Sequence, residues 1–208
     1  HDQMIMALEN GARVFLDEQR SAPCDIVGLG EMGIGNTSSA TAIICSATGT
    51  DIRQVIGRGT GVDDEGLKRK ADVLQRALVL HKPNPENGLE LLRTLGGFEL
   101  AGIAGAVLAA AACGCCIVLD GVISTAAGLI AHLICPEVAG YLIAGHNSVE
   151  KSQQVALKKM DLTGVVDLQF RLGEGTGGAV AINLVDLACR TMREMASFEE
   201  AGVDSGNI

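Results

Sequence analysis

The chain of 208 residues is long enough for one sizeable hydrophobic core, or for one domain and part of another. Its formal net charge of −9 and its lack of a Lys/Arg-rich run argue against nucleic-acid binding, so a small molecule or a second copy of the chain is the expected partner. The seven cysteines lie mostly in apolar runs, which indicates reduced thiols in a cytoplasmic protein; Cys113–Cys116 lacks the second ligand pair of a metal site.

An amphipathic helix over residues 3–20 opens the chain and ends before Pro23. The helix is already in progress at His1, so we expect an amino-terminal part of a longer parent chain to be missing. Residues 25–29 then read as a short buried strand, since they are apolar apart from one aspartate and one glycine.

The strand runs into a glycine-rich turn, residues 30–39, that carries a single carboxylate, Glu31. Asn36 or Thr37 can cap the helix predicted for residues 38–48. The free N–H groups and the positive dipole end of that helix would receive an anion. The turn is therefore a candidate phosphate cradle with an acid beside it.

The same turn matches a dinucleotide-binding fingerprint, Gly28-x-Gly30-x-x-Gly33, with Asp51 at a suitable distance for a ribose contact. An NAD(P)-binding oxidoreductase domain is the alternative that this match supports. Against it, the acid of such a unit ends a second strand, whereas Asp51 follows a helix in what reads as a turn. A phosphate loop of the Gly-x-x-x-x-Gly-Lys-Ser/Thr type is absent from the sequence.

A third glycine-rich loop, residues 56–61, precedes a long helix expected over residues 63–81. That helix carries three consecutive cations, Lys68, Arg69 and Lys70. Such a cluster is usually a solvated helix face, and the alternative is that one of the three reaches a ligand phosphate.

Residues 100–119 are uncharged, and this stretch is nominally long enough to cross a bilayer. It consists mostly of alanine and glycine, lacks flanking aromatic and basic residues, and is broken at Cys113–Cys116. After a short helix at 86–95 we therefore expect a buried helix over 98–112, a buried strand over 115–119, and no membrane insertion.

Two further loops place polar residues after strands. Asp120 and Gly121 follow the strand just described and precede a helix. Residues 141–150 repeat this strand, turn and helix pattern, with His146 and Ser148 in the turn.

The stretch Arg171–Ala179 is the most informative, and residues 162–171 lead into it as a fourth strand. It places one carboxylate, Glu174, among four glycines ahead of a terminal helix expected over 180–197. The glycines let the backbone approach a ligand, which suits Glu174 to act as a general base beside an oxyanion or phosphate cradle. The alternative is a tight turn in which Thr176 caps the helix and Glu174 faces water.

Four repeats of strand, loop and helix predict an α/β protein with a mostly parallel sheet. Ligands of such sheets bind beyond the carboxyl ends of the strands. The polar loop residues should therefore converge on one crevice, and they are Glu31, Asp120, His146, Ser148 and Glu174.

Six blocks of the sequence, residues 33–44, 57–61, 95–99, 120–126, 171–177 and 194–199, carry a family resemblance. In this order they are similar to the nicotinate-nucleotide–dimethylbenzimidazole phosphoribosyltransferase family, in its carboxyl-terminal part. The resemblance implies a Rossmann-like three-layer fold, with a mostly parallel sheet flanked by helices. It also implies that residues 1–208 are the large α/β domain of a longer parent, and that segments 1–20 and 190–208 pack with the missing small amino-terminal domain, which contributes to the benzimidazole pocket.

The resemblance implies phosphoribosyl transfer from nicotinate mononucleotide to 5,6-dimethylbenzimidazole in cobalamin nucleotide-loop assembly, giving α-ribazole 5′-phosphate and nicotinate with inversion at the anomeric carbon. The family's general base matches Glu174, whose pKa partial desolvation would raise. Glu31 matches the second active-site acid, placed to stabilise the cationic sugar. The reaction needs no metal and no cofactor, and the family is dimeric.

Backbone N–H groups of both glycine-rich turns are the expected phosphate donors. Lys70 and Ser148 align with family positions near the nucleotide. The expected substrate-binding residues are Gly33, Ile34, Gly35, Asn36, Thr37, Lys70, Gly121, Ser148, Gly173, Gly175, Thr176 and Gly177. The competing hypotheses are the NAD(P)-dependent oxidoreductase and a non-catalytic alanine- and glycine-rich scaffold.

Overall fold

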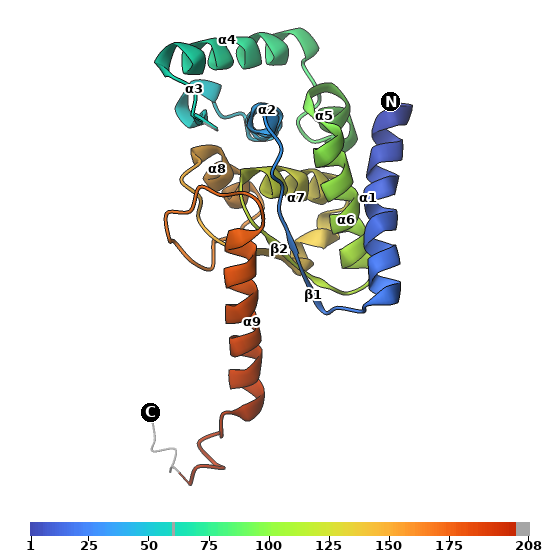
Figure 1. Cartoon of the computed structure of the whole chain (residues 1–208), viewed down its shortest axis with the longest axis vertical. Helices are drawn as coiled ribbons and strands as arrows, with labels where there is room; N and C mark the ends of the chain where they lie inside the picture. The colour runs from blue at the N-terminus through green and yellow to red at the C-terminus, as the bar shows by residue number, and fades with distance from the viewer. Residues whose placement is uncertain (60, 203–208) are drawn as a thin grey trace.

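A computed structural model describes residues 1–59 and 61–202, and Figure 1 shows its architecture. Three short strands, β1 Ile26–Leu29, β2 Cys116–Leu119 and β3 Leu142–Ala144, form a parallel sheet in that order. The predicted α/β class and the parallel sheet are therefore confirmed.

The fourth predicted strand, residues 162–171, is wrong. The segment is an irregular loop that makes a single parallel bridge, between Val166 and His146. Gln169 has a φ of 56°, in the left-handed region, which interrupts the extended backbone that strand pairing requires. The sheet consequently has three strands in the described part of the chain.

Helices surround this small sheet. In chain order they are α1 Asp2–Ser21, α2 Asn36–Thr48, α3 Ile52–Val55, α4 Asp64–His81, α5 Gly88–Leu95, α6 Phe98–Ala112, α7 Val122–Ile134, the 3-10 helix η1 Pro136–Tyr141, α8 Lys151–Lys159 and α9 Thr176–Glu194. The sequence predicts α1, α4 and α6 to within two residues at each end. It does not predict α3 and η1, which are too short to show a helical period.

The uncharged stretch is a buried helix followed by a buried strand, as predicted. α6 lies side by side with α1 (Figure 1), and glycines let the two backbones touch: a Cβ on Gly105 would overlap the carbonyl of Leu8, and one on Gly11 would overlap Gly102. α7 packs on α6 as well, so most of this stretch is covered by protein, and only residues 112–114 are exposed. Across the described residues, the helices fall short of the length and apolar character that crossing a membrane demands.

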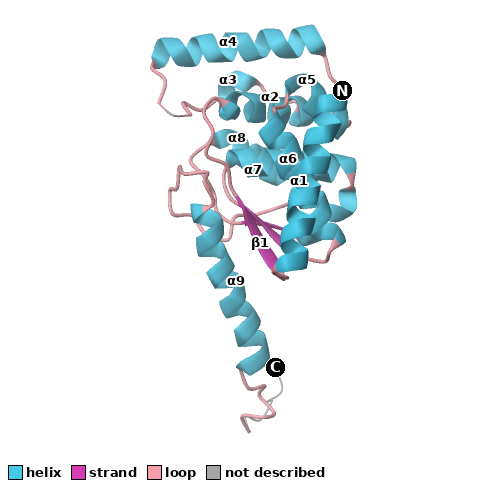
Figure 2. Ribbon diagram, turned by 45° about the vertical axis from the view of Figure 1, so that its right-hand side comes forward, coloured by secondary structure: helices cyan, strands magenta, loops and turns pink. Residues whose placement is uncertain are grey.

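The last helix, α9, leaves the body of the protein. Its first two turns pack on β1 and β2, and the rest extends away from the other elements (Figure 2). The prediction placed it at 180–197, but it starts earlier, at Thr176, and ends at Glu194. Residues 203–208 of the predicted segment 190–208 lie outside the described residues.

The carboxyl ends of the three parallel strands meet at one edge of the sheet. The loops after β1, β2 and β3, together with the loop before α9, gather at this edge. That edge is where ligands bind in open α/β sheets.

Candidate active site

A cleft of ≈710 Å³ lies at this edge of the sheet, and most of the predicted site residues line it. They come from the loop after β1, from the first turn of α2, from α4, and from the loops after β2, after β3 and before α9. The predicted residues in its lining are Glu31, Gly33, Ile34, Gly35, Asn36, Thr37, Lys70, Gly121, Ser148, Gly173 and Glu174.

The two glycine-rich loops are in direct backbone contact. The Glu31 N–H donates to the carbonyl of Gly173 over 2.6 Å. A Cβ on Gly30 would overlap the backbone of Glu174 and Gly175, so only glycine allows this approach. Two carboxylates that are far apart in the sequence thus face one cleft.

Glu31 is held by its own loop. Its carboxylate accepts the N–H of Gly33, at 2.8 and 2.9 Å to the two oxygens, and the side-chain amide of Asn36. The Gly33 N–H is therefore engaged by Glu31, although the sequence assigned it to a phosphate. The side chain is only partly buried, so its remaining surface faces the cleft.

The predicted side-chain cap of α2 is wrong. Gly35 occupies the cap position with a φ of 92°, and neither Asn36 nor Thr37 caps the helix. Asn36 instead binds Glu31, and the Thr37 hydroxyl accepts a hydrogen bond from Lys70. The first N–H groups of α2 have no partner within the helix, and they border the cleft.

Lys70 is the member of the basic cluster that reaches the cleft. Its Nζ donates to Thr37 Oγ1 over 3.0 Å and to the Gly57 carbonyl over 3.1 Å. Burial lowers the pKa of Lys70, and nearby Glu150 opposes that shift. Lys68 and Arg69 are exposed, so the cluster combines a solvated face with one cation directed at the site.

The first turn of α9 is capped by a carboxylate from the sheet and not by Thr176. Gly175 holds the cap position with a φ of 101°. Asp120 Oδ2 accepts the Gly175 N–H over 3.0 Å, and Oδ1 accepts the Gly178 N–H over 2.8 Å. The Gly175 N–H is therefore not free for a phosphate, and Gly175, Thr176 and Gly177 lie outside the described lining of the cleft.

Asp120 and His146 do not face the crevice as predicted. Both are fully buried, and His146 Nε2 lies 3.4 Å from Asp120 Oδ1. Burial by itself would raise the pKa of Asp120, but His146 and the N–H groups of Gly175 and Gly178 hold it below its ordinary value. Asp120 and His146 lie under the first turn of α9, because Gly177 packs directly on the histidine ring.

Glu174 is exposed. The expected desolvation of this carboxylate is therefore not provided by the described residues. The cleft beside it is lined by apolar side chains that are also exposed, Met32 at 80%, Ile34 at 89% and Leu172 at 49%.

Sequence reasoning missed Arg58, Glu150 and Arg171 in the cleft lining. Glu150 packs against Gly57, where a Cβ would overlap its carboxylate. Arg171 begins the glycine-rich stretch that carries Glu174, and its place there could have identified it as a residue of the cleft. Glu150 and Arg58 carry no local pattern that sets them apart from ordinary surface charges.

The structure lacks the second strand that a dinucleotide-binding unit would have after its first helix, in the described residues. α2 leads into α3 and α4, and β2 follows only after α6. Asp51 is the N-cap of α3, where its carboxylate accepts the Arg53 N–H over 2.8 Å. Asp51 therefore does not lie at the end of a second strand, where a dinucleotide-binding unit places the acid that binds the ribose.

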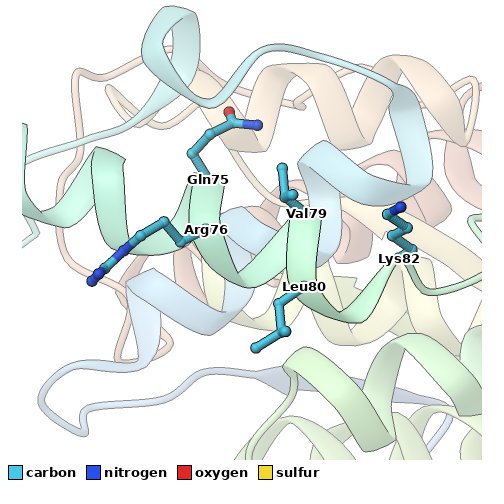
Figure 3. A pocket seen from close by; sticks show the side chains of 5 residues that line it. All are labelled: Gln75, Arg76, Val79, Leu80 and Lys82. Atoms are coloured by element: carbon cyan, nitrogen blue, oxygen red, sulfur yellow. The ribbon is translucent and has the colours of Figure 1, made fainter.

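A separate hollow of ≈490 Å³ lies on α4 and is unlike the cleft. Figure 3 shows its five lining residues, Gln75, Arg76, Val79, Leu80 and Lys82. They offer no carboxylate for acid–base chemistry, and all belong to α4 or its carboxyl-terminal cap. The cleft at the sheet edge is accordingly the candidate active site.

Comparisons with known proteins show the family of the chain. A family model described as phosphoribosyltransferase matches residues 1–203. Nicotinate-nucleotide–dimethylbenzimidazole phosphoribosyltransferases from Chloroflexus aggregans and Geobacter sp. (strain M21) are 49% and 47% identical to the chain over 86% and 98% of its length. The matched stretches cover 51% and 58% of those relatives, so the chain spans about half the length of the curated relatives it matches.

A solved structure, CobT from Thermus thermophilus, superimposes with a TM-score of 0.91 at 38% sequence identity. The match covers 98% of this chain and 60% of that protein. From the extent of the family match and these identities, the chain belongs to the nicotinate-nucleotide–dimethylbenzimidazole phosphoribosyltransferase family.

Proposed function

We propose that the whole protein transfers phosphoribose from nicotinate mononucleotide to a benzimidazole base such as 5,6-dimethylbenzimidazole, giving α-ribazole 5′-phosphate and nicotinate. One observation carries the proposal: two carboxylates, Glu31 and Glu174, face a cleft that also holds an open helix N-terminus and Lys70. An anion site beside two acids suits a phosphorylated sugar whose anomeric carbon becomes cationic during transfer.

The phosphate would bind at the amino end of α2. The N–H groups of Asn36 and Thr37 lie in its first turn, and the dipole of the helix favours negative charge there. Lys70, fixed by Thr37 and Gly57, adds a positive charge at the same place. Because the N–H of Gly175 is bonded to Asp120, the loop before α9 is the poorer phosphate donor of the two.

Glu174 would act as the general base. A ring nitrogen of the benzimidazole attacks the anomeric carbon, the bond from that carbon to the nicotinate nitrogen breaks with inversion, and Glu174 accepts the N–H proton that the benzimidazole loses. Glu31 would stabilise the cationic sugar. The leaving group is nicotinate and not pyrophosphate, so the step as written needs neither a metal ion nor a cofactor.

The base pocket would need further walls. Met32, Ile34 and Leu172 offer apolar surface to a planar base, but they and Glu174 are exposed. We propose that residues 1–208 form the large α/β domain, with a Rossmann-like three-layer arrangement in the whole protein, and that a small amino-terminal domain completes the pocket. Exposed apolar side chains in segment 190–208, such as Met192 at 85% and Phe198 at 74%, support packing of this segment with that domain. α1, the predicted segment 1–20, already packs on α6.

A cytoplasmic homodimer is the form that we propose for the protein, with nicotinate mononucleotide and a benzimidazole as its small-molecule partners. The activity is tested by incubating the whole protein with both substrates and separating the products by chromatography. Equal amounts of nicotinate and α-ribazole 5′-phosphate are expected. If NADH binds tightly while neither product forms, the oxidoreductase alternative replaces this proposal.

A further inference from the structure

The loop that carries Glu174 is tied to the sheet by one buried carboxylate, Asp120. Asp120 directly follows β2, and its two oxygens accept the N–H groups of Gly175 at 3.0 Å and Gly178 at 2.8 Å. Gly175 is the next residue after Glu174 in the chain. The carboxylate therefore fixes the backbone on one side of the proposed base.

Asp120 is itself held by its surroundings. Its N–H donates to Ser124 Oγ over 2.9 Å and to the Leu29 carbonyl over 3.3 Å, and its own carbonyl accepts Gln153 Nε2 over 2.9 Å. His146 Nε2 lies 3.4 Å from Oδ1, and neither ring nitrogen of His146 has a hydrogen-bond partner within the described residues. The hydrogen bonds hold the backbone of Asp120 beside the end of β1, and His146, which follows β3, lies against its carboxylate. The structure therefore holds Asp120 in place without a ligand.

The two helices that follow the glycine-rich turns differ in how their first N–H groups are bonded. α2 and α9 both begin at a glycine with positive φ, Gly35 and Gly175, and neither receives a cap from its own side chains. Of these two first turns, only that of α9 receives a carboxylate from the sheet, in the described residues. Because the Asp120 carboxylate accepts the N–H groups of Gly175 and Gly178 and offsets the helix dipole, α9 is the poorer anion site of the two.

We propose that Asp120 is the positioning residue for the transfer reaction. It anchors the turn that presents Glu174, and it makes the start of α9 a poorer phosphate site than the start of α2. This inference rests on the proposed function of Glu174 as the base. A displacement of about 1 Å in a reacting group costs on the order of 100-fold in rate, so loosening this anchor should lower turnover although Asp120 touches no substrate.

The kinetic test compares the whole protein carrying Asp120→Asn with a control variant that loses the N-cap of a different helix. Asparagine keeps the volume of Asp120 and one acceptor, but it presents an NH₂ group to one of the two N–H donors. Asn87→Ala is the control, because Asn87 caps α5 through the Glu90 N–H at 3.0 Å and lies outside the cleft lining. We expect kcat of Asp120→Asn to fall on the order of 100-fold with KM for nicotinate mononucleotide unchanged. A fall that only follows the folded fraction, as in the control, overturns the proposal.

A second readout does not depend on activity. Amide hydrogen exchange across residues 173–180, measured by mass spectrometry, should be about 10-fold or more faster in Asp120→Asn, and unchanged in Asn87→Ala. If the wild-type protein makes no product, the proposed function fails while this exchange experiment still tests the anchor. An unchanged exchange rate at these residues would show that Asp120 does not anchor the turn.

Should Asp120→Asn fail to fold, Ser124→Ala provides a milder perturbation. It removes one partner of the Asp120 N–H and leaves the bond to Leu29 in place. A smaller fall in kcat with an unchanged KM, together with faster exchange over 173–180, supports the anchor. Wild-type values of both quantities overturn it.

Discussion

Replacing Lys70 by methionine should weaken binding of nicotinate mononucleotide without unfolding the protein. Lys70 Nζ lies 3.0 Å from Thr37 Oγ1, which places the ammonium group at the first turn of α2, and methionine keeps the unbranched stem without the charge. A hydrogen bond from a charged donor contributes about 1.5–3 kcal/mol. At about 1.4 kcal/mol per factor of ten, its loss should raise Kd roughly 10- to 100-fold.

The fold should tolerate this change. Because burial lowers the pKa of Lys70, keeping the ammonium charged in the folded protein is costly, and its removal offsets part of the two lost hydrogen bonds. The assay is calorimetric titration of the whole protein at two salt concentrations, with Lys68→Met as the control on the exposed face of α4. If Lys70→Met binds the mononucleotide as tightly as Lys68→Met does, the assignment of the phosphate to the α2 N-terminus is refuted.

Three further predictions follow from the same geometry. Glu174→Gln should fold like the wild type, because the side chain is exposed. Its kcat, measured as nicotinate release, should fall about 100- to 10,000-fold. Near-normal turnover would show that Glu174 is not the base. Gly177→Ala should strongly lower the free energy of unfolding measured in urea, since a Cβ would overlap the ring of buried His146. Gly35→Ala should lower it by only about 1–2 kcal/mol, because Gly35 has a φ of 92° but open space around it. Equal losses in the two variants would contradict this packing. The pKa of Asp120 lies below its ordinary 3.8, so its contribution to stability is present above that pH and is lost as pH falls through the folded value. Thermal unfolding against pH should therefore show a shallower acid limb in Asp120→Asn, and an equally steep limb would argue against the anchored carboxylate.

Several helices could be predicted from the sequence because their signals are local. α4 begins after Asp63, which caps it through the Gly66 N–H at 2.7 Å, and an apolar period continues to His81. α6 follows a glycine pair and ends before Gly114, where a φ of 76° turns the chain. By contrast, residues 162–171 carry alternating apolar residues, but the left-handed Gln169 and the contacts with the β3 loop decide against a strand.

Most of the residues that line the cleft could be predicted from the sequence, but the hydrogen bonds that hold their loops could not. The two glycine-rich turns identify Glu31 and Glu174, and the parallel sheet brings them together. The partners of their loops are long-range contacts, such as the carboxylate of Asp120 on the Gly175 N–H, and no local pattern reveals them. The sequence left the exposure of Glu174 open between a ligand-facing and a water-facing side chain, because it depends on which surfaces cover the cleft.

The most direct test of the proposed function is a single-turnover reaction of the whole protein with nicotinate mononucleotide and 5,6-dimethylbenzimidazole, with Glu174→Gln beside it. We predict that the wild type releases one nicotinate for each α-ribazole 5′-phosphate formed, and that Glu174→Gln still binds the mononucleotide but forms product on the order of 100-fold more slowly or worse. Product formation at the wild-type rate by Glu174→Gln, or its absence from a wild-type protein that binds both substrates, would contradict the proposed function.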